Sequence, residues 1–295
     1  MSVEFDSRSQ LAAERLIAAS LEEDLHDVGD LTSQALIDAD ATGSVDIVAR
    51  ATGVLSGMPI APLVFSKVDA RVTIEERIPD GTLLSPGDVV ATVSGPVQAL
   101  LSGERTVLNF LTHLSGVATR TRAFVDAIAG TQATILDTRK TLPGWRDLHK
   151  YAVRCGGGAN HRMGLFDAVL IKDNHLAAWR EAHPTATIAE AVRHARDVSP
   201  TCEFVEVEVD TLEQLADALQ APPDMVLLDN MTCDQMREAV AMRNDTAPEV
   251  LLEASGGITL ETAAGIARTG VDRISVGGLT HSAPALDLAF DWSAA

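Results

Sequence analysis

Cationic side chains follow two predicted strands beyond residue 131 of the chain. Arg139 and Lys140 come after the run 133–136, and Lys172 follows the run 168–171. In a barrel of parallel strands, the residues just beyond the strand ends converge on one rim. Guanidinium and ammonium groups gathered there would bind carboxylates or phosphates.

This cationic segment stands out because the chain as a whole is acidic. Asp and Glu number 42 against 23 Lys and Arg, giving a net charge of −19, yet three of the four lysines lie between residues 139 and 172. An acidic surface repels nucleic acids and anionic membranes, so the sequence excludes those partners and points to a small anionic ligand. Arg146, Lys150 and Arg154, four residues apart, are interpreted as the solvated face of a helix.

Two carboxylates occupy equivalent positions one strand-helix unit apart. Glu208 and Asp229 each lie at the end of a predicted strand. Carboxylates so placed suit Mg²⁺, which uses one or two of them together with substrate phosphates. The alternative is that both are helix caps or surface acids.

Glycine-rich segments follow several strands. Gly156-Gly157-Gly158 precedes His161 and Arg162, while Ser255-Gly256-Gly257 and Val276-Gly277-Gly278 follow the last two strands. Consecutive glycines let a backbone bend sharply or approach a ligand. Loops of the last two kinds bind phosphate through their N–H groups, and the first is alternatively a flexible loop.

Alternating strands and helices must position these residues. Capping boxes at Thr187/Glu190 and Thr232/Gln235 open two of the helices. The pattern predicts an incomplete α/β barrel with fewer than eight strands, and a doubly wound open sheet is the alternative. No Gly-x-Gly-x-x-Gly motif supports dinucleotide binding. The predicted strands are 133–136, 168–171, 204–209, 225–228, 250–252 and 273–276.

The first part of the chain has a different pattern. A helix at 10–25, strands at 44–50, 71–77 and 89–93, and a long helical stretch at 98–129 predict a separate α/β domain. We expect residues 1–112 to form this domain, with 280–295 packing back on it, and 113–279 to form the barrel. No signal peptide or membrane span is readable, and three dispersed cysteines suit a reducing cytoplasm, so a cytoplasmic location is expected.

Six segments in order resemble the quinolinate phosphoribosyltransferase family. Two earlier segments, Glu22 to Thr32 and Glu104 to Asn109, also match it. The resemblance therefore extends over nearly the whole chain. The six segments are Asp137 to Gly144, Lys150 to Val153, Gly156 to Arg162, Leu170 to His175, Glu206 to Asp210 and Leu227 to Asn230.

The resemblance implies a fold and a reaction. The fold is a barrel of about seven strands beside an N-terminal α/β sandwich domain, in a homodimer or hexamer. The reaction converts quinolinate and phosphoribosyl pyrophosphate, with Mg²⁺, to nicotinate mononucleotide, pyrophosphate and CO₂, a step of NAD biosynthesis by a pentosyltransferase.

Residue roles follow from the same resemblance. Arg139, His161, Arg162 and Lys172 would cage the two substrate carboxylates, with Thr138 alongside and Arg105 supplied by a neighbouring subunit. Lys140, Glu208 and Asp229 are the expected catalytic residues: Lys140 would contact phosphoribosyl pyrophosphate, and Glu208 and Asp229 the metal and ribose. The 5′-phosphate would be bound by the two later glycine loops, which comprise Ser255, Gly256, Gly257, Val276, Gly277 and Gly278.

Two positions depart from the family pattern. Gly278 stands where alanine is more usual, and His149 stands where glutamine is more usual, on an expected helix surface. A related phosphoribosyltransferase that does not decarboxylate its substrate is the main alternative function. A Schiff-base aldolase using Lys172 and a non-catalytic anion-binding protein are further alternatives.

Overall fold

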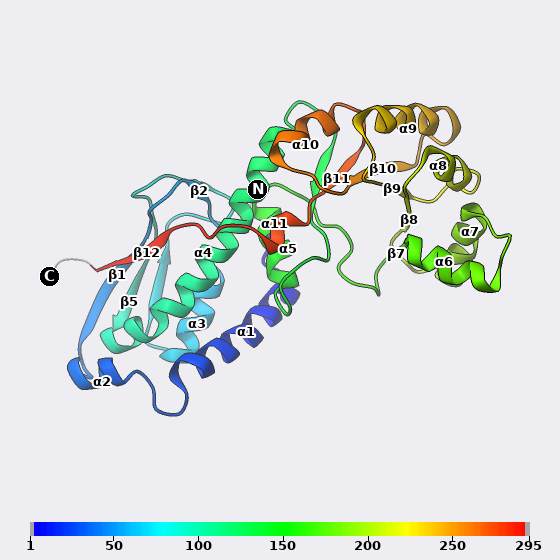
Figure 1. Cartoon of the computed structure of the whole chain (residues 1–295). Coiled ribbons are helices and arrows are strands. Elements are labelled where there is room, and N and C mark those ends of the chain that lie inside the picture. The colour runs from blue at the N-terminus through cyan, green and yellow to red at the C-terminus, as the bar shows by residue number, and fades with distance from the viewer. Residues whose placement is uncertain (1–2, 293–295) are drawn as a thin grey trace. The chain divides into compact units, whose positions relative to one another are not determined.

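The structure, a computed structural model, describes residues 3–292 and divides into two compact units (Figure 1). The domain boundary expected at residue 112 falls within the single helix α4, Val97–Ala127. Residues 140–158, expected in the barrel, group with the first unit. The first unit comprises Met1–Arg122, Lys140–Gly158 and Gly278–Ala295, and the second comprises Ala123–Arg139 and Ala159–Gly277.

A four-stranded antiparallel sheet with the order β12-β1-β5-β3 forms the centre of the first unit. The last strand along the chain pairs with the first, since Phe290 lies opposite Ile47. Residues 280–292 thus contribute a strand to this sheet. Its strands are β1 (Thr42–Ala49), β3 (Thr73–Glu76), β5 (Val89–Pro96) and β12 (Leu288–Trp292), and a separate pair is β2 (Gly53–Val54) and β4 (Leu83–Leu84).

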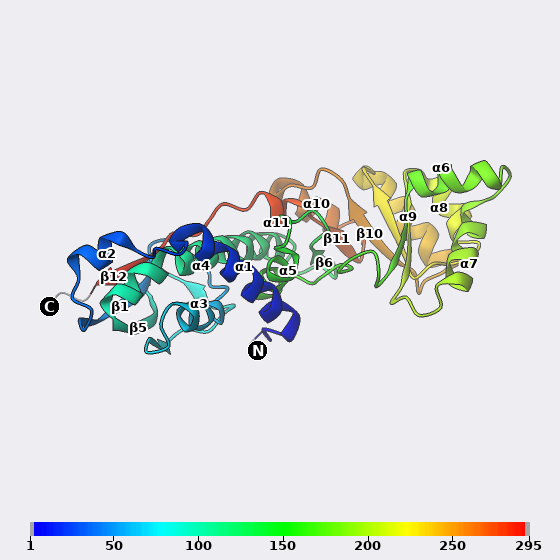
Figure 2. The same cartoon turned by 90° about the horizontal axis from the view of Figure 1, so that it is seen from below.

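Helices complete the first unit, and Figure 2 gives a second view of them beside the sheet. Asp6 caps the first helix by accepting the N–H of Ser9 at 2.8 Å. Gly103 of α4 lies so close to Phe65 that a Cβ would be 2.5 Å from the ring. The helices other than α4 are α1 (Ser7–Leu25), α2 (Leu31–Leu36), α3 (Ile60–Val68), α5 (Arg146–Cys155) and α11 (Gly278–His281).

Six parallel strands form the sheet of the second unit, with the order β6-β11-β10-β9-β8-β7. The edge strands β6 and β7 are not hydrogen-bonded to each other, so the barrel is incomplete. Among the described residues it has six strands, whereas about seven were expected. All six predicted strands are confirmed within a few residues. They are β6 (Thr134–Leu136), β7 (Val169–Ile171), β8 (Val205–Val209), β9 (Met225–Asp229), β10 (Leu251–Ser255) and β11 (Arg273–Ser275).

Helices between the strands form a neighbouring layer in which α7, α8, α9 and α10 contact one another in sequence. Both predicted capping boxes are confirmed: Glu190 N–H donates to Thr187 Oγ1, and Gln235 N–H to Thr232 Oγ1. The helices are α6 (Asp173–Ala182), α7 (Ile188–Val198), α8 (Leu212–Ala218), α9 (Cys233–Thr246) and α10 (Leu260–Ala267).

The expectation of solvated residues on α5 was wrong at two positions. Lys150 and His149 are both fully buried. His149 Nε2 lies 2.8 Å from Nε2 of His113, and the ring packs near Trp145. Burial, with a smaller contribution from His113, lowers the pKa of His149 to about 3, so the buried ring is neutral. Helical spacing alone could not show that other elements cover this face.

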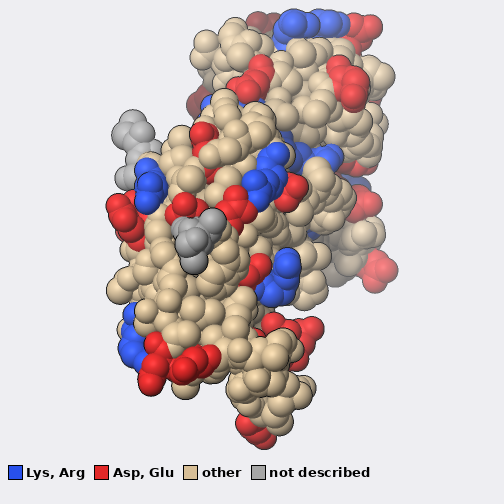
Figure 3. Space-filling model, turned by 90° about the vertical axis from the view of Figure 1, so that its left-hand side faces the viewer, with Lys and Arg blue, Asp and Glu red and all other residues tan. Residues whose placement is uncertain are grey.

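Charge is dispersed on the face drawn in Figure 3, where acidic and basic side chains are interspersed rather than gathered in one patch.

Among residues 3–292, none of the helices combines the length and apolar character needed to cross a bilayer.

Candidate active site

The carboxyl ends of the six parallel strands place the candidate residues along one edge of the second unit's sheet. Thr138 and Arg139 follow β6, Lys172 follows β7, and Val276 and Gly277 follow β11. Glu208, Asp229 and Ser255 are within the last two residues of β8, β9 and β10. The strand order therefore brings chemistry from separate parts of the sequence to one rim.

Strand register explains the ion pair between Lys172 and Glu208. Ile171 lies opposite Val207, which places Lys172 beside Glu208 on the neighbouring strand. The ammonium of Lys172 accordingly donates to Oε2 of Glu208, and both side chains are partly exposed. A partly exposed ion pair of this kind contributes only modestly to stability, so both groups remain available to a ligand.

Two further cations of this unit, Arg139 and Arg162, interact with each other. Arg162 is buried, and its guanidinium donates to the carbonyl of Ala168 at 3.2 Å. Burial lowers its pKa, the charge of Arg139 lowers it further, and Glu206 and Asp167 oppose the shift. Arg139 itself is exposed. Two guanidinium groups that repel each other would be stabilised by a bound anion.

The segment carrying His161 is held by a buried carboxylate. Asp137 accepts the backbone N–H of His161 at 3.0 Å and the side-chain amide of Asn160 at 2.6 Å. A parallel bridge joins Leu136 to Ala159, which aligns this segment with the end of β6. These contacts fix the backbone from which His161 and Arg162 project.

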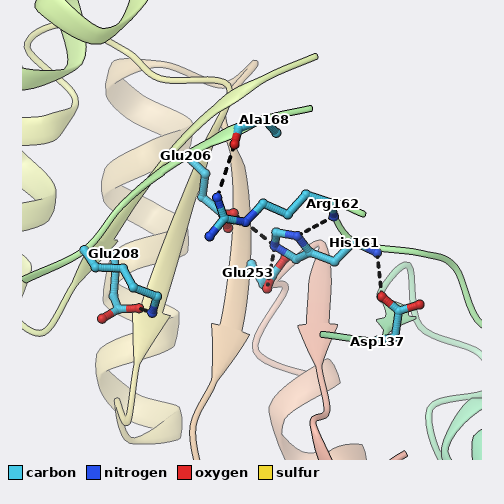
Figure 4. Close-up of polar contacts among 8 residues, drawn as sticks. Asp137, His161, Arg162, Ala168, Glu206, Glu208 and Glu253 are labelled. Atoms are coloured by element: carbon cyan, nitrogen blue, oxygen red, sulfur yellow. Dashed lines mark hydrogen bonds and ion pairs between the residues drawn. The ribbon is translucent and has the colours of Figure 1, made fainter. Parts of the chain in front are cut away.

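His161 faces two buried glutamates (Figure 4). Its Nε2 lies 3.0 Å from Oε2 of Glu206 and 3.5 Å from Oε1 of Glu253, and its Nδ1 accepts the N–H of Arg162 at 2.7 Å. Burial and the neighbouring charge of Glu206 raise the pKa of Glu253 to about 7, while His161, Ser275 and Arg273 oppose the shift. Within the described residues, these three are the ones grouped closely enough to hold a metal ion.

Glu206, Glu253, Asp137 and Asn160 were not predicted as site residues. Glu206 precedes Glu208 by two positions, as Glu253 precedes Ser255, and residues two apart on a strand share a face. That spacing was the available signal. It was obscured because an alternating Val-Glu pattern is typical of a half-exposed strand, whereas here the glutamates are buried.

The glycine loop after β10 is closely packed against Asn230. Ser255 lies opposite Asp229, and the N–H of Asn230 donates to the carbonyl of Ser255. Gly256 and Gly257 follow with φ of 97° and 58°. A Cβ on Gly256 would lie 2.1 Å from Oδ1 of Asn230, so only glycine fits there.

Three predicted residues belong to the first unit. Arg105 is exposed on α4, and the carbonyl of Lys140 accepts the hydroxyl of Thr280 at 2.7 Å. A Cβ on Gly278 would lie 3.3 Å from a guanidinium nitrogen of Arg120, so an alanine there would require the Arg120 side chain to shift by a few tenths of an ångström.

Magnesium chemistry is compatible with the carboxylates at the rim. Glu208 and Asp229 lie on one face of neighbouring strands, because Glu208 is opposite Leu227. Asp229 accepts the side-chain amide of Asn230 at 2.7 Å, and Lys172 contacts one oxygen of Glu208. Each carboxylate has a second oxygen of the kind that Mg²⁺ prefers.

Known proteins resemble the chain over nearly its whole length. Sequence models of the C-terminal and N-terminal domains of quinolinate phosphoribosyl transferase match residues 117–291 and 30–115. A nicotinate-nucleotide pyrophosphorylase [carboxylating] of Mycobacterium leprae is 46% identical, covering 95% of this chain and 97% of that protein. Quinolinate phosphoribosyltransferase [decarboxylating] 1b of Nicotiana tabacum is 38% identical, covering 92% and 80%.

Solved structures agree with the sequence comparison. The crystal structure of NadC from Streptococcus pyogenes superposes with a TM-score of 0.89 at 37% identity, covering 96% of this chain and 98% of that one. The nicotinate-nucleotide pyrophosphorylase from Francisella tularensis gives 0.89 at 37% identity, covering 99% and 100%. The chain therefore belongs to the quinolinate phosphoribosyltransferase family.

Proposed function

We propose that this protein transfers the phosphoribosyl group of phosphoribosyl pyrophosphate to quinolinate and releases pyrophosphate and CO₂, forming nicotinate mononucleotide for NAD biosynthesis. The observation that carries the proposal is the group of cations at the rim of the parallel sheet in a member of this family. Quinolinate is a dianion, and Arg139, Arg162 and Lys172 offer more positive charge than one carboxylate needs.

Two bonds change in the first step. The ring nitrogen of quinolinate attacks C1 of the ribose, and the bond from C1 to pyrophosphate breaks with its electron pair going to the leaving oxygen. Positive charge develops on the ribose, where the carboxylate of Glu208 would stabilise it. Lys140 would contact the leaving pyrophosphate.

Decarboxylation then follows from the charge on the ring. The bond to the adjacent carboxylate breaks, CO₂ leaves, and the electron pair stays on a ring carbon beside the cationic nitrogen until a proton replaces it. The protein's main contribution is position and exclusion of water. Arg139, Arg162 and Lys172, with Thr138 alongside, would hold the two carboxylates during both steps.

We also propose roles for the remaining rim residues. Glu208 and Asp229 would hold Mg²⁺, which supplies charge neutralisation to the pyrophosphate when bound. The N–H groups of the loops containing Ser255, Gly256, Gly257, Val276, Gly277 and Gly278 would bind the 5′-phosphate. The free thiols of Cys155, Cys202 and Cys233 are compatible with the cytoplasm as its location.

A homodimer or hexamer that shares its sites is part of the proposal. Arg105 is exposed on α4 and would enter the carboxylate site of a neighbouring subunit. Arg105→Ala and Lys172→Ala subunits should each be inactive alone and regain partial activity in mixed dimers. Demonstrated heterodimers without activity would refute a shared site.

The activity is tested by release of labelled CO₂ from carboxyl-labelled quinolinate. Release should require both phosphoribosyl pyrophosphate and Mg²⁺, and removal of Mg²⁺ with a chelator should abolish it reversibly. Turnover of nicotinate with no turnover of quinolinate would instead identify a related transferase that does not decarboxylate.

A further inference from the structure

Glu206 and Glu253 form an unusual buried carboxylate pair inside the second unit. Both residues are 0% exposed, and their carboxylates have few polar partners: Nε2 of His161 lies 3.0 Å from Glu206 and 3.5 Å from Glu253, and Ser275 also acts on Glu253. They come from β8 and β10, on either side of β9. Burying carboxylates this poorly compensated costs stability, and replacing such groups with apolar residues is often neutral or stabilising. Fold stability alone therefore does not explain them.

The hydrogen bonds of His161 show what the pair contacts. Nδ1 of the ring accepts the N–H of Arg162, so a neutral His161 carries its proton on Nε2. That nitrogen is the one directed at the two carboxylates, 3.0 and 3.5 Å away. The imidazole thus spans from the carboxylate pair to the backbone of Arg162 (Figure 4).

The same hydrogen bonds argue against a metal ion among these three side chains. A histidine that binds a metal donates from its other ring nitrogen, as a rule to a carboxylate or a carbonyl. Here the other nitrogen accepts a hydrogen bond, and Nε2 must keep its proton. The cluster is arranged to receive an N–H, and a cation at that point would displace it.

We propose that Glu206 and Glu253 are positioning residues, which hold His161 in its Nε2–H tautomer and thereby fix the backbone of Arg162. The inference rests on the proposed function, in which Arg162 binds a carboxylate of the substrate. His161 then acts through Arg162 and does not itself provide a positive charge to the ligand.

Three contacts converge on this segment. Asp137 holds the backbone N–H of His161, the imidazole holds the N–H of Arg162, and Ala168 accepts from the Arg162 guanidinium. The Arg162 side chain therefore projects from a backbone that is held at both His161 and Arg162. Its guanidinium is restrained as well, by the carbonyl of Ala168. Such preorganisation reduces the entropy lost when a carboxylate binds.

The tautomer is tested first, in the ligand-free protein and without reference to activity. In protein labelled with ¹⁵N-histidine, the histidine signal that is lost in His161→Gln should report a protonated Nε2 and an unprotonated Nδ1. In the double variant Glu206→Met/Glu253→Met the protonated-Nε2 signal should shift or broaden. A protonated Nδ1 on His161 in the wild-type protein would overturn the inference.

Kinetics of the same double variant separate positioning from a structural role. We expect the KM for quinolinate to rise about tenfold, the loss typical of one hydrogen bond to a charged group, while the KM for phosphoribosyl pyrophosphate changes little. The melting temperature should stay the same or increase. A lower melting temperature with unchanged KM values would show a structural role and overturn the inference.

Conservative and control variants complete the design. Glu206→Gln retains an acceptor oxygen for Nε2–H, so it should keep the tautomer signal and a KM near that of the wild type even if the double variant unfolds. The matched control, Glu203→Met/Glu249→Met, removes two exposed glutamates and should change neither the tautomer signal nor the KM for quinolinate.

Zinc bound stoichiometrically to wild-type protein but not to the Glu206→Met/Glu253→Met variant would identify a metal site and refute positioning. A wild-type protein inactive on quinolinate would refute the proposed function, whereas the tautomer result would stand.

Discussion

Replacing Gly256 by alanine should disturb one loop in a way that can be calculated from its surroundings. The residue has a φ of 97°, where a residue with a Cβ is strained by about 1–3 kcal/mol. The added Cβ would lie 2.1 Å from Oδ1 of Asn230. Asn230 must therefore move, breaking its 2.7 Å hydrogen bond to Asp229, which is worth about 1 kcal/mol.

Gly257 provides the matched control. Its φ of 58° is also positive, but a Cβ there meets nothing within 4 Å. Gly257→Ala should cost only the left-handed backbone penalty of about 1–2 kcal/mol, against about 3 kcal/mol for Gly256→Ala. At roughly 2–4 °C per kcal/mol, the melting temperature should fall by about 6–12 °C for Gly256→Ala and about half as much for Gly257→Ala.

The assay combines calorimetry with kinetics. Because the loop is proposed to bind the 5′-phosphate, Gly256→Ala should raise the KM for phosphoribosyl pyrophosphate more than the KM for quinolinate. Adding Asn230→Gly should recover part of the stability, giving a combined loss smaller than the sum of the single losses. Equal losses for Gly256→Ala and Gly257→Ala would refute the reasoning, because the contact with Asn230 would then be unimportant.

Three further predictions concern other parts of the molecule. Arg139→Ala should raise the KM for quinolinate about ten- to hundredfold in steady-state assays, with an unchanged melting temperature because the side chain is exposed; unchanged kinetics would contradict its proposed role. His149→Gln should remove an acid-sensitive part of the stability. The folded pKa is about 3 and the ordinary value 6.5, so between these two pH values wild-type stability should fall by up to about 1.4 kcal/mol per pH unit, relative to the variant, in urea titrations. If the difference in free energy of unfolding between the wild type and the variant is the same at pH 5 as at pH 7, the assigned pKa is refuted. Thr232→Ala should cost about 1 kcal/mol by removing the cap of α9, measured by the same titration, whereas Thr232→Ser should be near neutral.

The barrel half of the fold was predictable because its signals are local. Each strand is a short apolar run followed by polar or glycine residues, and capping residues such as Thr187 mark the helices between them. Strand order and register are not local, so the pairing of Lys172 with Glu208 could not be read before the sheet was known. The position of both residues at strand ends was enough to select them as candidates.

Burial was the main quantity that the sequence did not provide. His149 and Lys150 have polar side chains on a strongly amphipathic helix, yet both are fully buried. Glu206 and Glu253 likewise occupy strand positions where charge usually indicates solvent. In each case tertiary contacts from distant segments cover the side chain, and a helical or alternating period carries no information about them.

The pairing of β12 with β1 affects how the protein is made. β1 is synthesised long before β12, so during translation its β12-facing edge has no partner. Open strand edges of this kind associate with other chains and favour aggregation. Closing so long a loop also slows folding of the first unit, because contacts between distant segments form slowly, whereas in the second unit β7 to β11 each pair with a sequence neighbour and only β6 pairs with a distant strand. Fusion tags or premature stops near residue 288 are therefore expected to reduce the yield of folded protein more than their small size suggests.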